Sequence, residues 1–437
     1  MRITVIGTGY LGATHAACMA ELGYEVLGLD IDPEKVAALS AGRVPMFEPG
    51  LEELLTRHVS SGRLRFTTSW EEAGAFGDVH FVCTNTPQRK GEFAADMSYF
   101  DRAVDQLAPV LRPGAVVVGK STVPVGSAAR IAERLTELGP GDVALAWNPE
   151  FLREGYAVKD TLHPDRLVIG VAEPGGRAEQ TLRQLYAPLT EDGVPLVVTD
   201  FATAELVKAA ANSFLATKIS FINAMAEVCE AAGADVVQLS AALAFDERIG
   251  GRFLNAGLGF GGGCLPKDIR AFMARAGELG ADQALTFLRE VDSINMRRRS
   301  RMVELAREQC GGGFLGRRVA VLGAAFKPNT DDVRDSPALN VAAQIQLQGA
   351  QVTVYDPKAM DNARKQFPSL TFADSVLEAC EGAHVVLHLT EWQEFRELDP
   401  EAVGSVVASR QILDGRNILD PAVWRTAGWT YRALGRP

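Results

Sequence analysis

One segment of the chain combines a cysteine with features that make a thiol reactive. Residues 259–268 read GFGGGCLPKD, and the glycines allow a loop that closes tightly around a ligand. Pro266 favours a helix that begins there, so Cys264 should lie just outside a helix N-terminus and next to Lys267. Both features stabilise a thiolate, and Asp268 should project from the same first turn. The alternative is a small buried cysteine with a capping acid.

Two further pairs of polar residues have a spacing that suits chemistry. Glu150 and Glu154 share one face if the residues after Pro149 are helical, and such a pair can position a water or a hydroxyl group. Two glutamates four apart are, however, usually a solvated helix face. Lys208 and Asn212 lie four apart among small and apolar side chains, so both need partners if they are buried.

The N-terminal residues carry a dinucleotide fingerprint. From residue 3 to residue 30 the chain reads as a short apolar strand, the turn GTGYLG, a helix and a second strand. Gly7 makes the tight turn, Gly9 lets the backbone approach a pyrophosphate, and Gly12 lets helix and strand pack closely. Asp30 is placed to accept hydrogen bonds from a ribose diol and would repel a 2′-phosphate, which favours NAD over NADP. A purely structural glycine turn is the alternative.

A dinucleotide site, a reactive thiol, carboxylates and a lysine together describe one kind of chemistry. An alcohol gives hydride to NAD and becomes an aldehyde, the thiolate adds to the aldehyde, and the adduct gives a second hydride. The resulting thioester then needs water. Covalent capture explains why a dehydrogenase would carry a nucleophilic cysteine, because simple alcohol oxidation needs only a base.

The elements that must position these residues belong to an α/β protein. Strands at 79–83 and 116–119 end in turns that should border the nicotinamide, because ligands lie outside the carboxyl ends of parallel strands. A helix over 203–232 is too charged to span a membrane and should form a buried spine between domains. After a glycine-rich linker at 310–316 the β-α-β pattern restarts, with Gly323 followed by two alanines where a second fingerprint would need glycines. This half should therefore hold something other than a dinucleotide.

We therefore expect two Rossmann-like doubly wound domains joined by a long central helix. The predicted boundaries are 1–200 for the cofactor domain, 201–310 for a central helical domain with the cysteine loop, and 311–437 for a C-terminal α/β domain.

Composition excludes several classes of protein. The 437 residues are 47% hydrophobic and 23% charged, as in an ordinary globular protein, and the net charge of −11 disfavours binding to nucleic acid or anionic membranes. No apolar run approaches the length of a membrane helix, and the N-terminus turns glycine-rich before a signal-peptide core could form, so we expect a cytoplasmic protein. The six cysteines contain no Cys-x-x-Cys pair and the six histidines show no zinc spacing, so we expect neither disulfides nor a metal. His384 and His388 should lie in a buried strand.

The chain resembles the UDP-glucose/GDP-mannose dehydrogenase family over essentially its whole length. The motifs that carry the resemblance are residues 7–12, 121–126 (STVPVG), 148–155 (NPEFLREG), 208–212 (KAAAN), 261–268 (GGGCLPKD), 326–337 (FKPNTDDVRDSP) and 414–416 (DGR). The resemblance implies a four-electron oxidation of UDP-glucose to UDP-glucuronate that uses two NAD. It also implies a homodimer or higher oligomer.

The matching motifs imply a role for each residue. Cys264 is similar to the nucleophile, and Asp268 and Lys208 to the groups that take the hydroxyl proton and stabilise the oxyanion. Glu150 is similar to the residue that activates water, Thr122 to a partner of that water, and Asn212 completes the catalytic set. The implied cofactor contacts are Gly7, Gly9, Tyr10, Leu11, Gly12, Asp30, Lys35, Thr86, Thr122, Glu154, Lys267 and Arg334. The implied sugar-nucleotide contacts are Glu150, Phe151, Leu152, Glu154, Lys208, Asn212, Arg248, Phe260, Gly261, Phe326, Lys327 and Arg416. Of these, Arg248 would come from a neighbouring subunit, and Lys327 and Arg416 would reach in from a UDP-sugar-binding C-terminal domain.

Two residues depart from the pattern of the family. Gly263 stands where many relatives have serine, which should loosen the loop, and Leu11 replaces the commoner valine. Neither change should disturb the chemistry.

Three alternatives remain. The same mechanism could act on GDP-mannose or a UDP-N-acetyl-hexosamine, although residues 161–166 resemble the UDP-glucose branch more closely. A two-electron hydroxyacid dehydrogenase would produce one NADH per substrate and tolerate Cys264→Ala. A silent nucleotide-sensing or scaffold protein would bind without turnover.

Overall fold

The computed structural model describes residues 1–436 and divides into two compact units. The first unit comprises residues 1–211 and 270–280, and the second comprises residues 212–269 together with the chain from Ala281 onward. The strands are β1 Arg2–Ile6, β2 Glu25–Leu29, β3 Leu64–Thr67, β4 Val79–Val82, β5 Val116–Gly119, β6 Ala144–Trp147, β7 Leu167–Val171, β8 Leu196–Thr199, β9 Arg318–Leu322, β10 Gln351–Tyr355, β11 Thr371–Phe372, β12 Val385–His388, β13 Gln411–Asp414 and β14 Thr430–Ala433.

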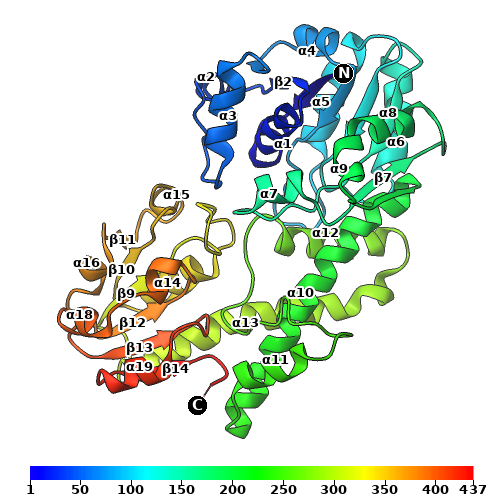
Figure 1. The fold of residues 1–437 in the computed structure, drawn as a ribbon. Helices are drawn as coiled ribbons and strands as arrows, with labels where there is room; N and C mark the ends of the chain where they lie inside the picture. The colour runs from blue at the N-terminus through cyan, green and yellow to red at the C-terminus, as the bar shows by residue number, and fades with distance from the viewer. Residues whose placement is uncertain (437) are drawn as a thin grey trace. The chain divides into compact units, whose positions relative to one another are not determined.

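Helices connect and cover these strands, as Figure 1 shows. The helices are α1 Tyr10–Glu21, α2 Pro33–Ser40, α3 Leu51–Ser60, α4 Trp70–Phe76, α5 Ser98–Leu107, η1 Ala108–Val110, α6 Ser127–Leu138, α7 Ala157–Leu162, α8 Arg177–Leu185, α9 Ala187–Glu191, α10 Phe201–Ala232, α11 Val236–Ala244, α12 Leu265–Glu278, η2 Asp282–Leu285, α13 Thr286–Gln309, α14 Pro337–Leu347, α15 Met360–Gln366, α16 Val376–Cys380, α17 Gln393–Arg396, α18 Pro400–Gly404 and α19 Pro421–Thr426.

The first unit is built on an eight-stranded sheet with the order β3-β2-β1-β4-β5-β6-β7-β8. All neighbouring strands are parallel except β6 and β7. Successive side chains point to opposite faces of this sheet, so Phe81 joins an apolar core with α1 and α3 while Val82 joins a second core with α5 and α6. Helices therefore cover both faces, as in a doubly wound fold.

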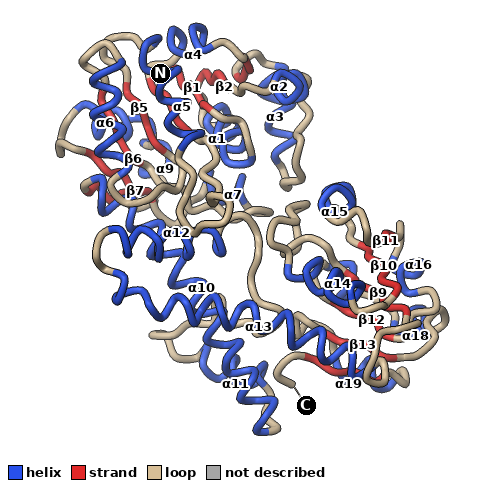
Figure 2. Tube along the Cα trace, turned by 180° about the vertical axis from the view of Figure 1, so that it is seen from behind, coloured by secondary structure: helices blue, strands red, loops and turns tan. Residues whose placement is uncertain are grey.

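The second unit contains a six-stranded, all-parallel sheet with the order β11-β10-β9-β12-β13-β14. Relabelled from its first strand, this order is 3-2-1-4-5-6, the same as that of the first six strands of the other sheet. The strands appear in red between blue helices in Figure 2. The predicted fold class, with two Rossmann-like sheets and a long central helix, is confirmed.

Two helices run from one unit into the other. α10 has 32 residues and begins two residues before its predicted start, and α12 has 14 residues, of which the last nine belong to the first unit. In the second unit, α13 carries two buried arginines. Arg298 pairs with Glu230 at 3.3 Å, and Arg299 pairs with Asp335 at 2.8 Å. Among residues 1–436 no helix is long and apolar enough to cross a membrane.

Candidate active site

The turn between β1 and α1 forms a cradle for a pyrophosphate. Gly7 has a φ of +85°, and a Cβ on Gly12 would lie 1.8 Å from the carbonyl oxygen of Gly7. A Cβ on Gly9 would meet only Asn85 Oδ1 at 4.0 Å, so the backbone is open on that side. No side chain in the described chain caps α1, which leaves the amides of its first turn for an anion. The glycine positions therefore fit a dinucleotide.

Asp30 completes this cradle at the end of β2. Its carboxylate accepts hydrogen bonds from the Thr8 amide at 2.9 Å and the Asp32 amide at 3.1 Å, and it pairs with Lys35 Nζ at 3.0 Å. Burial by itself raises the pKa of Asp30, but these donors outweigh burial and hold that pKa below its ordinary value. An ionised carboxylate of this kind accepts ribose hydroxyls and disfavours a 2′-phosphate.

The turns that follow β4 and β5 lie together beside this cradle. Thr86 Oγ1 donates to the Thr122 carbonyl oxygen at 2.6 Å, and Ser121 Oγ donates to the Thr84 carbonyl oxygen at 2.6 Å. Thr86 and Thr122, two predicted site residues more than thirty positions apart, are thus brought into contact.

Glu150 lies in a loop, so the helix that would have put Glu150 and Glu154 on one face is not formed. Residues 148–153 have no regular structure, and α7 begins only at Ala157. Instead, Glu150 Oε2 accepts from the Leu152 amide at 2.8 Å, and Glu150 Oε1 pairs with Lys208 Nζ at 3.0 Å. Both side chains are nearly inaccessible to solvent, so each charge offsets the desolvation penalty of burying the other. The partner that the buried Lys208 required is therefore a predicted catalytic residue.

Phe151, which follows Glu150 in this loop, lies close to two cations. The Arg166 guanidinium lies 3.9 Å from the centroid of the Phe151 ring, and Lys208 Nζ lies 5.7 Å from it. This contact fixes the direction of the loop, since it joins the residues after β6 to the residues before β7.

Glu48 is a site residue that sequence reasoning missed. Its buried carboxylate bonds to the hydroxyl of Tyr10, a fingerprint residue, and accepts from the Gly155 amide at 2.6 Å and the Ala157 amide at 2.7 Å. Glu48 thereby links the dinucleotide turn to the loop that carries Glu150 and Glu154. A glutamate before the proline-glycine pair at 49–50 has no local signal for this role.

A buried lysine, Lys120, was also missed. Its Nζ donates to Asn148 Oδ1 at 3.0 Å, and the Tyr186 hydroxyl donates to the same oxygen at 2.6 Å. Burial lowers the pKa of Lys120 below its ordinary value. These contacts hold the start of the Glu150 loop against the end of β5.

Cys264 in the second unit occupies the predicted position, immediately before the first residue of α12. Its side chain is exposed, whereas the other five cysteines are buried. The Cys264 carbonyl accepts from the Asp268 amide at 2.9 Å, which closes the first turn of the helix behind the thiol. An accessible thiol at a helix N-terminus is the arrangement that favours a thiolate.

Asp268 is held from two sides. Asn212 Nδ2 donates to Asp268 Oδ2 at 2.7 Å, and Lys267 Nζ pairs with Asp268 Oδ1 at 2.6 Å. The Asp268 side chain is only 2% exposed, so these partners offset its desolvation. The structure thus joins Asn212 to Asp268, although they lie 56 residues apart in sequence.

The glycine loop before Cys264 is packed tightly within the second unit. Asn295 bonds to both the amide and the carbonyl of Phe260, at 2.7 and 3.0 Å, and the Gly262 amide donates to the Arg334 carbonyl at 2.9 Å. A Cβ on Gly261 would lie 2.3 Å from the Asp335 carbonyl oxygen. Only glycine permits this approach.

Gly263 has a more specific role than the predicted loosening of the loop. A Cβ there would lie 2.3 Å from the Arg334 guanidinium carbon, so Arg334 occupies the space of a side chain. Arg334 also pairs with Asp332 at 2.7 Å. The predicted cofactor contact Arg334 and the cysteine loop are therefore neighbours.

Arg416 joins three segments of the second unit. Its guanidinium donates to the carbonyls of Gly259 at 3.0 Å, Leu389 at 2.8 Å and Phe326 at 3.2 Å, and it pairs with Glu391 at 3.2 Å. The cysteine loop is thereby tied to the carboxyl ends of the second sheet. Lys327 Nζ lies 5.5 Å from the Phe326 ring centroid in the same region. Arg248 is 89% exposed and pairs with Asp246 of its own loop.

The second sheet does not repeat the dinucleotide site. Asp356 follows β10 as Asp30 follows β2, but its buried carboxylate accepts from the amides of Ala324, at 2.7 Å, and Ala325, at 2.9 Å, and from Trp392 Nε1 at 3.0 Å. The Asp356 side chain also accepts from the amides of Lys358 and Ala359, so it caps the surrounding backbone. Within residues 1–436, no group of three or more His, Cys, Asp or Glu residues is arranged to hold a metal ion.

The strand order of the first unit and its glycine turn define a dinucleotide-binding domain of the kind found in NAD-dependent dehydrogenases. Models of the UDP-glucose/GDP-mannose dehydrogenase family match the chain in three parts, the NAD binding domain at residues 1–190, the central domain at 202–297 and the UDP binding domain at 320–421. The chain belongs to this family, and the resemblance seen in the sequence is confirmed.

Individual relatives agree with this assignment. The chain is 42% identical to the UDP-glucose 6-dehydrogenase of Rhizobium meliloti (strain 1021), with 100% of each chain covered, and 40% identical to that of Pseudomonas aeruginosa, with 100% and 98% covered. A solved UDP-glucose dehydrogenase from Pyrobaculum islandicum superposes with a TM-score of 0.91 at 38% identity, covering 100% of this chain and 98% of the other. A UDP-D-ManNAc dehydrogenase from Pyrococcus horikoshii superposes with a TM-score of 0.87 at 29% identity, covering 100% and 99%.

Proposed function

We propose that this chain oxidises C6 of UDP-glucose to the carboxylate of UDP-glucuronate, with two NAD reduced per sugar. The observation that carries the proposal is the exposed thiol of Cys264 at the N-terminus of a 14-residue helix, in a chain with a dinucleotide cradle. Full-length relatives at 42% and 40% identity that bear the name UDP-glucose 6-dehydrogenase support the choice of sugar.

Asp268 and Lys208 take part in the first oxidation. NAD, when bound, supplies the hydride acceptor for both oxidations. Asp268, oriented by Asn212 and Lys267, receives the proton of the C6 hydroxyl as its carbon loses hydride. Lys208 stabilises the oxyanion charge that develops on the same oxygen.

Cys264 then retains the sugar between the two oxidations. Its thiolate forms a bond to the aldehyde carbon, and the protonated adduct is a thiohemiacetal. Loss of a second hydride from that carbon gives a thioester. Glu150 activates a water that adds to the thioester, with Thr122 as a partner of the water, and the thiolate leaves. The balance is one water consumed, two NAD reduced, and three protons released with the carboxylate product.

The remaining site residues bind and orient. Lys35 and Thr86 contact the cofactor with the fingerprint residues, and Glu154, Lys267 and Arg334 contact its nicotinamide half. Sugar-nucleotide contacts come from Phe151, Leu152, Phe260, Gly261, Phe326, Lys327 and Arg416.

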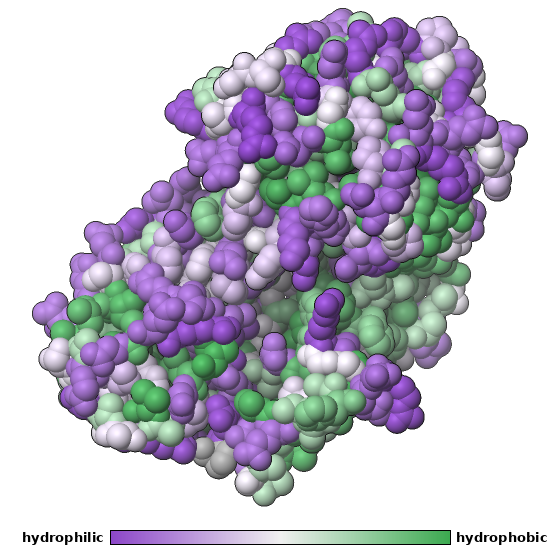
Figure 3. Space-filling model, in the orientation of Figure 1, coloured by the Kyte–Doolittle hydropathy of each residue, from purple (hydrophilic) through white to green (hydrophobic). Residues whose placement is uncertain are grey.

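The protein acts as a homodimer or larger homo-oligomer. Helix α10 presents Phe214, Phe221 and Val228 at 66%, 47% and 57% exposure, seven residues apart, and such a stripe on one face of a helix suits a second copy of the chain. Apolar side chains gather over α10 and α11 on the face seen in Figure 3. Arg248 lies beside the 89% exposed Phe245, and we assign this arginine to the sugar-nucleotide site of the partner.

The stoichiometry of NADH tests the proposal. Purified protein with excess NAD and limiting UDP-glucose should form two NADH per sugar, as measured by absorbance at 340 nm. Mass spectrometry of the sugar nucleotide should find only the uronate. One NADH per sugar, or free aldehyde in solution, would contradict it. GDP-mannose, UDP-N-acetyl-glucosamine and UDP-N-acetyl-mannosamine form the comparison panel, and turnover confined to any of them would replace the substrate.

A further inference from the structure

A buried carboxylate outside the proposed catalytic set contacts the loop that carries Thr122. Glu205, near the start of α10, is 2% exposed. Its two oxygens accept hydrogen bonds from the amides of Gly126 and Ala128, each at 2.7 Å. Gly126 is the N-cap residue of α6 and has a φ of +93°, and no side chain of its own segment caps this helix. Glu205 thus caps α6 from 77 residues away along the chain.

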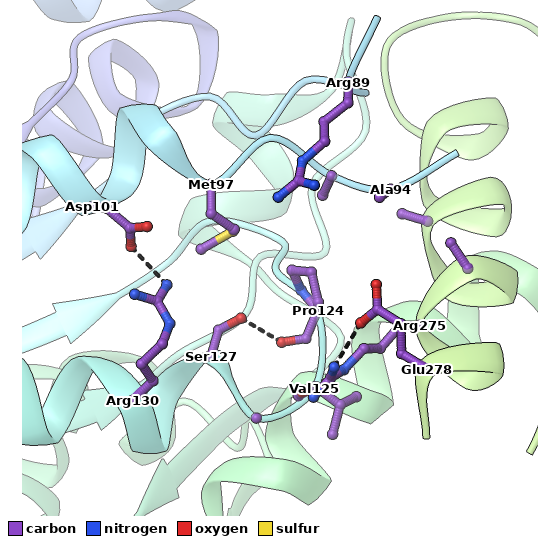
Figure 4. A pocket seen from close by; sticks show the side chains of 14 residues that line it. Arg89, Ala94, Met97, Asp101, Pro124, Val125, Ser127, Arg130, Arg275 and Glu278 are labelled. Carbon is purple, nitrogen blue, oxygen red and sulfur yellow. Dashed lines mark hydrogen bonds and ion pairs between the residues drawn. The ribbon is translucent and has the colours of Figure 1, made fainter. Parts of the chain in front are cut away.

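One side of this loop is open. A cavity of about 330 Å³ lies on one side of residues 124–127, as Figure 4 shows. Arg275, from the part of α12 in the same unit, crosses to the loop, and its Nε donates to the Val125 carbonyl at 2.8 Å. The hydrogen bonds that Glu205 accepts and the one that Arg275 donates therefore help to hold the loop beside this opening.

Burial disfavours the charged form of the Glu205 carboxylate. Burial raises the pKa of Glu205 above its ordinary value, and the amides of Gly126 and Ala128 and the charge of Arg275 oppose burial without cancelling it. The φ of +93° at Gly126 disfavours every residue but glycine, so position 126 cannot supply a side-chain cap and α6 takes its cap from α10.

One helical segment contacts two loops of the proposed site. Glu205 binds the Thr122 loop, and Lys208, three residues later on α10, pairs with Glu150 at 3.0 Å. Residues three apart on a helix are neighbours on one face. The first turns of α10 therefore set the spacing between the loop beside the nicotinamide and the carboxylate assigned to water activation.

We propose that Glu205 is a positioning residue, which acts through the Gly126 and Ala128 amides to hold Thr122 and its loop against the nicotinamide half of bound NAD. The inference rests on the proposed function. It assigns to Glu205 no contact with cofactor or sugar.

Glu205→Gln tests the inference, because the amide keeps the shape but places an N–H donor opposite a backbone N–H. We expect a KM for NAD about tenfold higher, a lower kcat, and a KM for UDP-glucose within about twofold of wild type, since one charge-assisted bond is lost at the cofactor loop only. Glu205→Asp keeps the charge but is one methylene shorter. Its KM for NAD should lie between that of wild type and that of Glu205→Gln. NAD affinity without sugar, from calorimetry of the full chain, should weaken in the same order.

Glu179→Gln is the matched control. Glu179 is also a buried glutamate. It accepts a hydrogen bond from the Gly175 amide at 2.8 Å and pairs with Arg183 at 2.6 Å. The helix that carries Glu179 holds no proposed site residue. It should leave both KM values unchanged. Wild-type constants in both Glu205 variants, or equal losses for NAD and UDP-glucose, would overturn the inference. Absence of UDP-glucose turnover in the wild type would instead contradict the proposed function, while NAD affinity would still test Glu205.

Discussion

Burial separates the six cysteines by reactivity. It raises the pKa of the Cys18, Cys83 and Cys380 thiols to about 12, and it also raises the pKa of Cys229 and Cys310. At neutral pH these thiols stay protonated and are poor nucleophiles. Cys264 is the exposed thiol of the described chain, so the covalent step is assigned to it on accessibility as well as on sequence.

Cys264→Ser should stop the reaction between its two oxidations. A serine hydroxyl is a much weaker nucleophile than a thiolate, so steady formation of uronate should fall by about 10³-fold or more. At most one NADH per subunit should form rapidly, and mass spectrometry of the sugar nucleotide should find the C6 aldehyde level of oxidation. The buried Cys310→Ser is the control and should turn over normally. Sustained two-NADH turnover by Cys264→Ser would refute covalent capture.

Glu150→Gln should stop the reaction one stage later. The amide cannot take a proton from water, so the thioester on Cys264 should accumulate after a burst of about two NADH per subunit. Intact-protein mass spectrometry should find the UDP-glucuronyl adduct, and hydroxylamine should release it as the hydroxamate. Because the variant also removes the buried ion pair between Glu150 and Lys208, the free energy of unfolding should fall along with the block. A burst without adduct would exclude Glu150 from hydrolysis.

At the scale of elements, the buried carboxylate of Asp414 organises the end of β13. Asp414 accepts from the four amides of residues 416–419, each at 2.9 Å, and from the Tyr431 hydroxyl at 3.0 Å, and His388 Nδ1 lies 2.9 Å away. This network shapes the loop that presents Arg416 to the cysteine loop. It also explains why His388 is a buried strand residue.

Asp414→Asn should destabilise the second unit in a pH-dependent way. Burial alone would raise the pKa of Asp414, but His388 and the backbone amides hold it below the ordinary value of 3.8. A depressed folded pKa stabilises the protein at pH values above 3.8, and this contribution is lost as the pH falls through the folded pKa. The variant should therefore unfold with about 3–5 kcal/mol less free energy at neutral pH, and the difference should shrink below about pH 4.

Urea unfolding followed by tryptophan emission measures this effect, since Trp392, Trp424 and Trp429 all lie in the second unit. Asp420→Asn, which removes only the exposed N-cap carboxylate of α19, is the control and should cost about 1 kcal/mol or less. A difference between Asp414→Asn and wild type that stays constant down to pH 3 would assign the stability to another group.

Local signals allowed most elements to be predicted. The strands at 79–83 and 116–119 and the helix at 203–232 lie within two residues of their predicted bounds, because apolar runs and turn residues act within a few positions. The condition that the residues after Pro149 are helical is not met, because Glu150 is held by the distant Lys208 and by the amide of Leu152. Glu48 and Glu205 could not be found from the sequence, since their partners lie about 80 to 110 positions away and no periodic pattern connects them.

At the scale of the whole molecule, the central region determines how copies of the chain would share a site. The apolar side chains of α10 at positions 214, 221 and 228 are exposed, and in the same unit Arg248 extends from an exposed loop. A twofold dimer would repeat each contact on both subunits. If Arg248 serves the partner, neither Arg248→Ala nor Cys264→Ala should be active alone, because each homodimer lacks one component of every site.

Mixing the two variants separates shared sites from independent ones. In a mixed dimer, the subunit with intact Cys264 receives Arg248 from its partner, so one site of two is complete. Random exchange makes half of the dimers mixed, and about a quarter of wild-type activity should return. If Arg248 acted within its own subunit, every site would lack one component and none would return. Phe221→Glu in both variants provides the control, because a charge in the apolar stripe of α10 should block association and abolish the recovery.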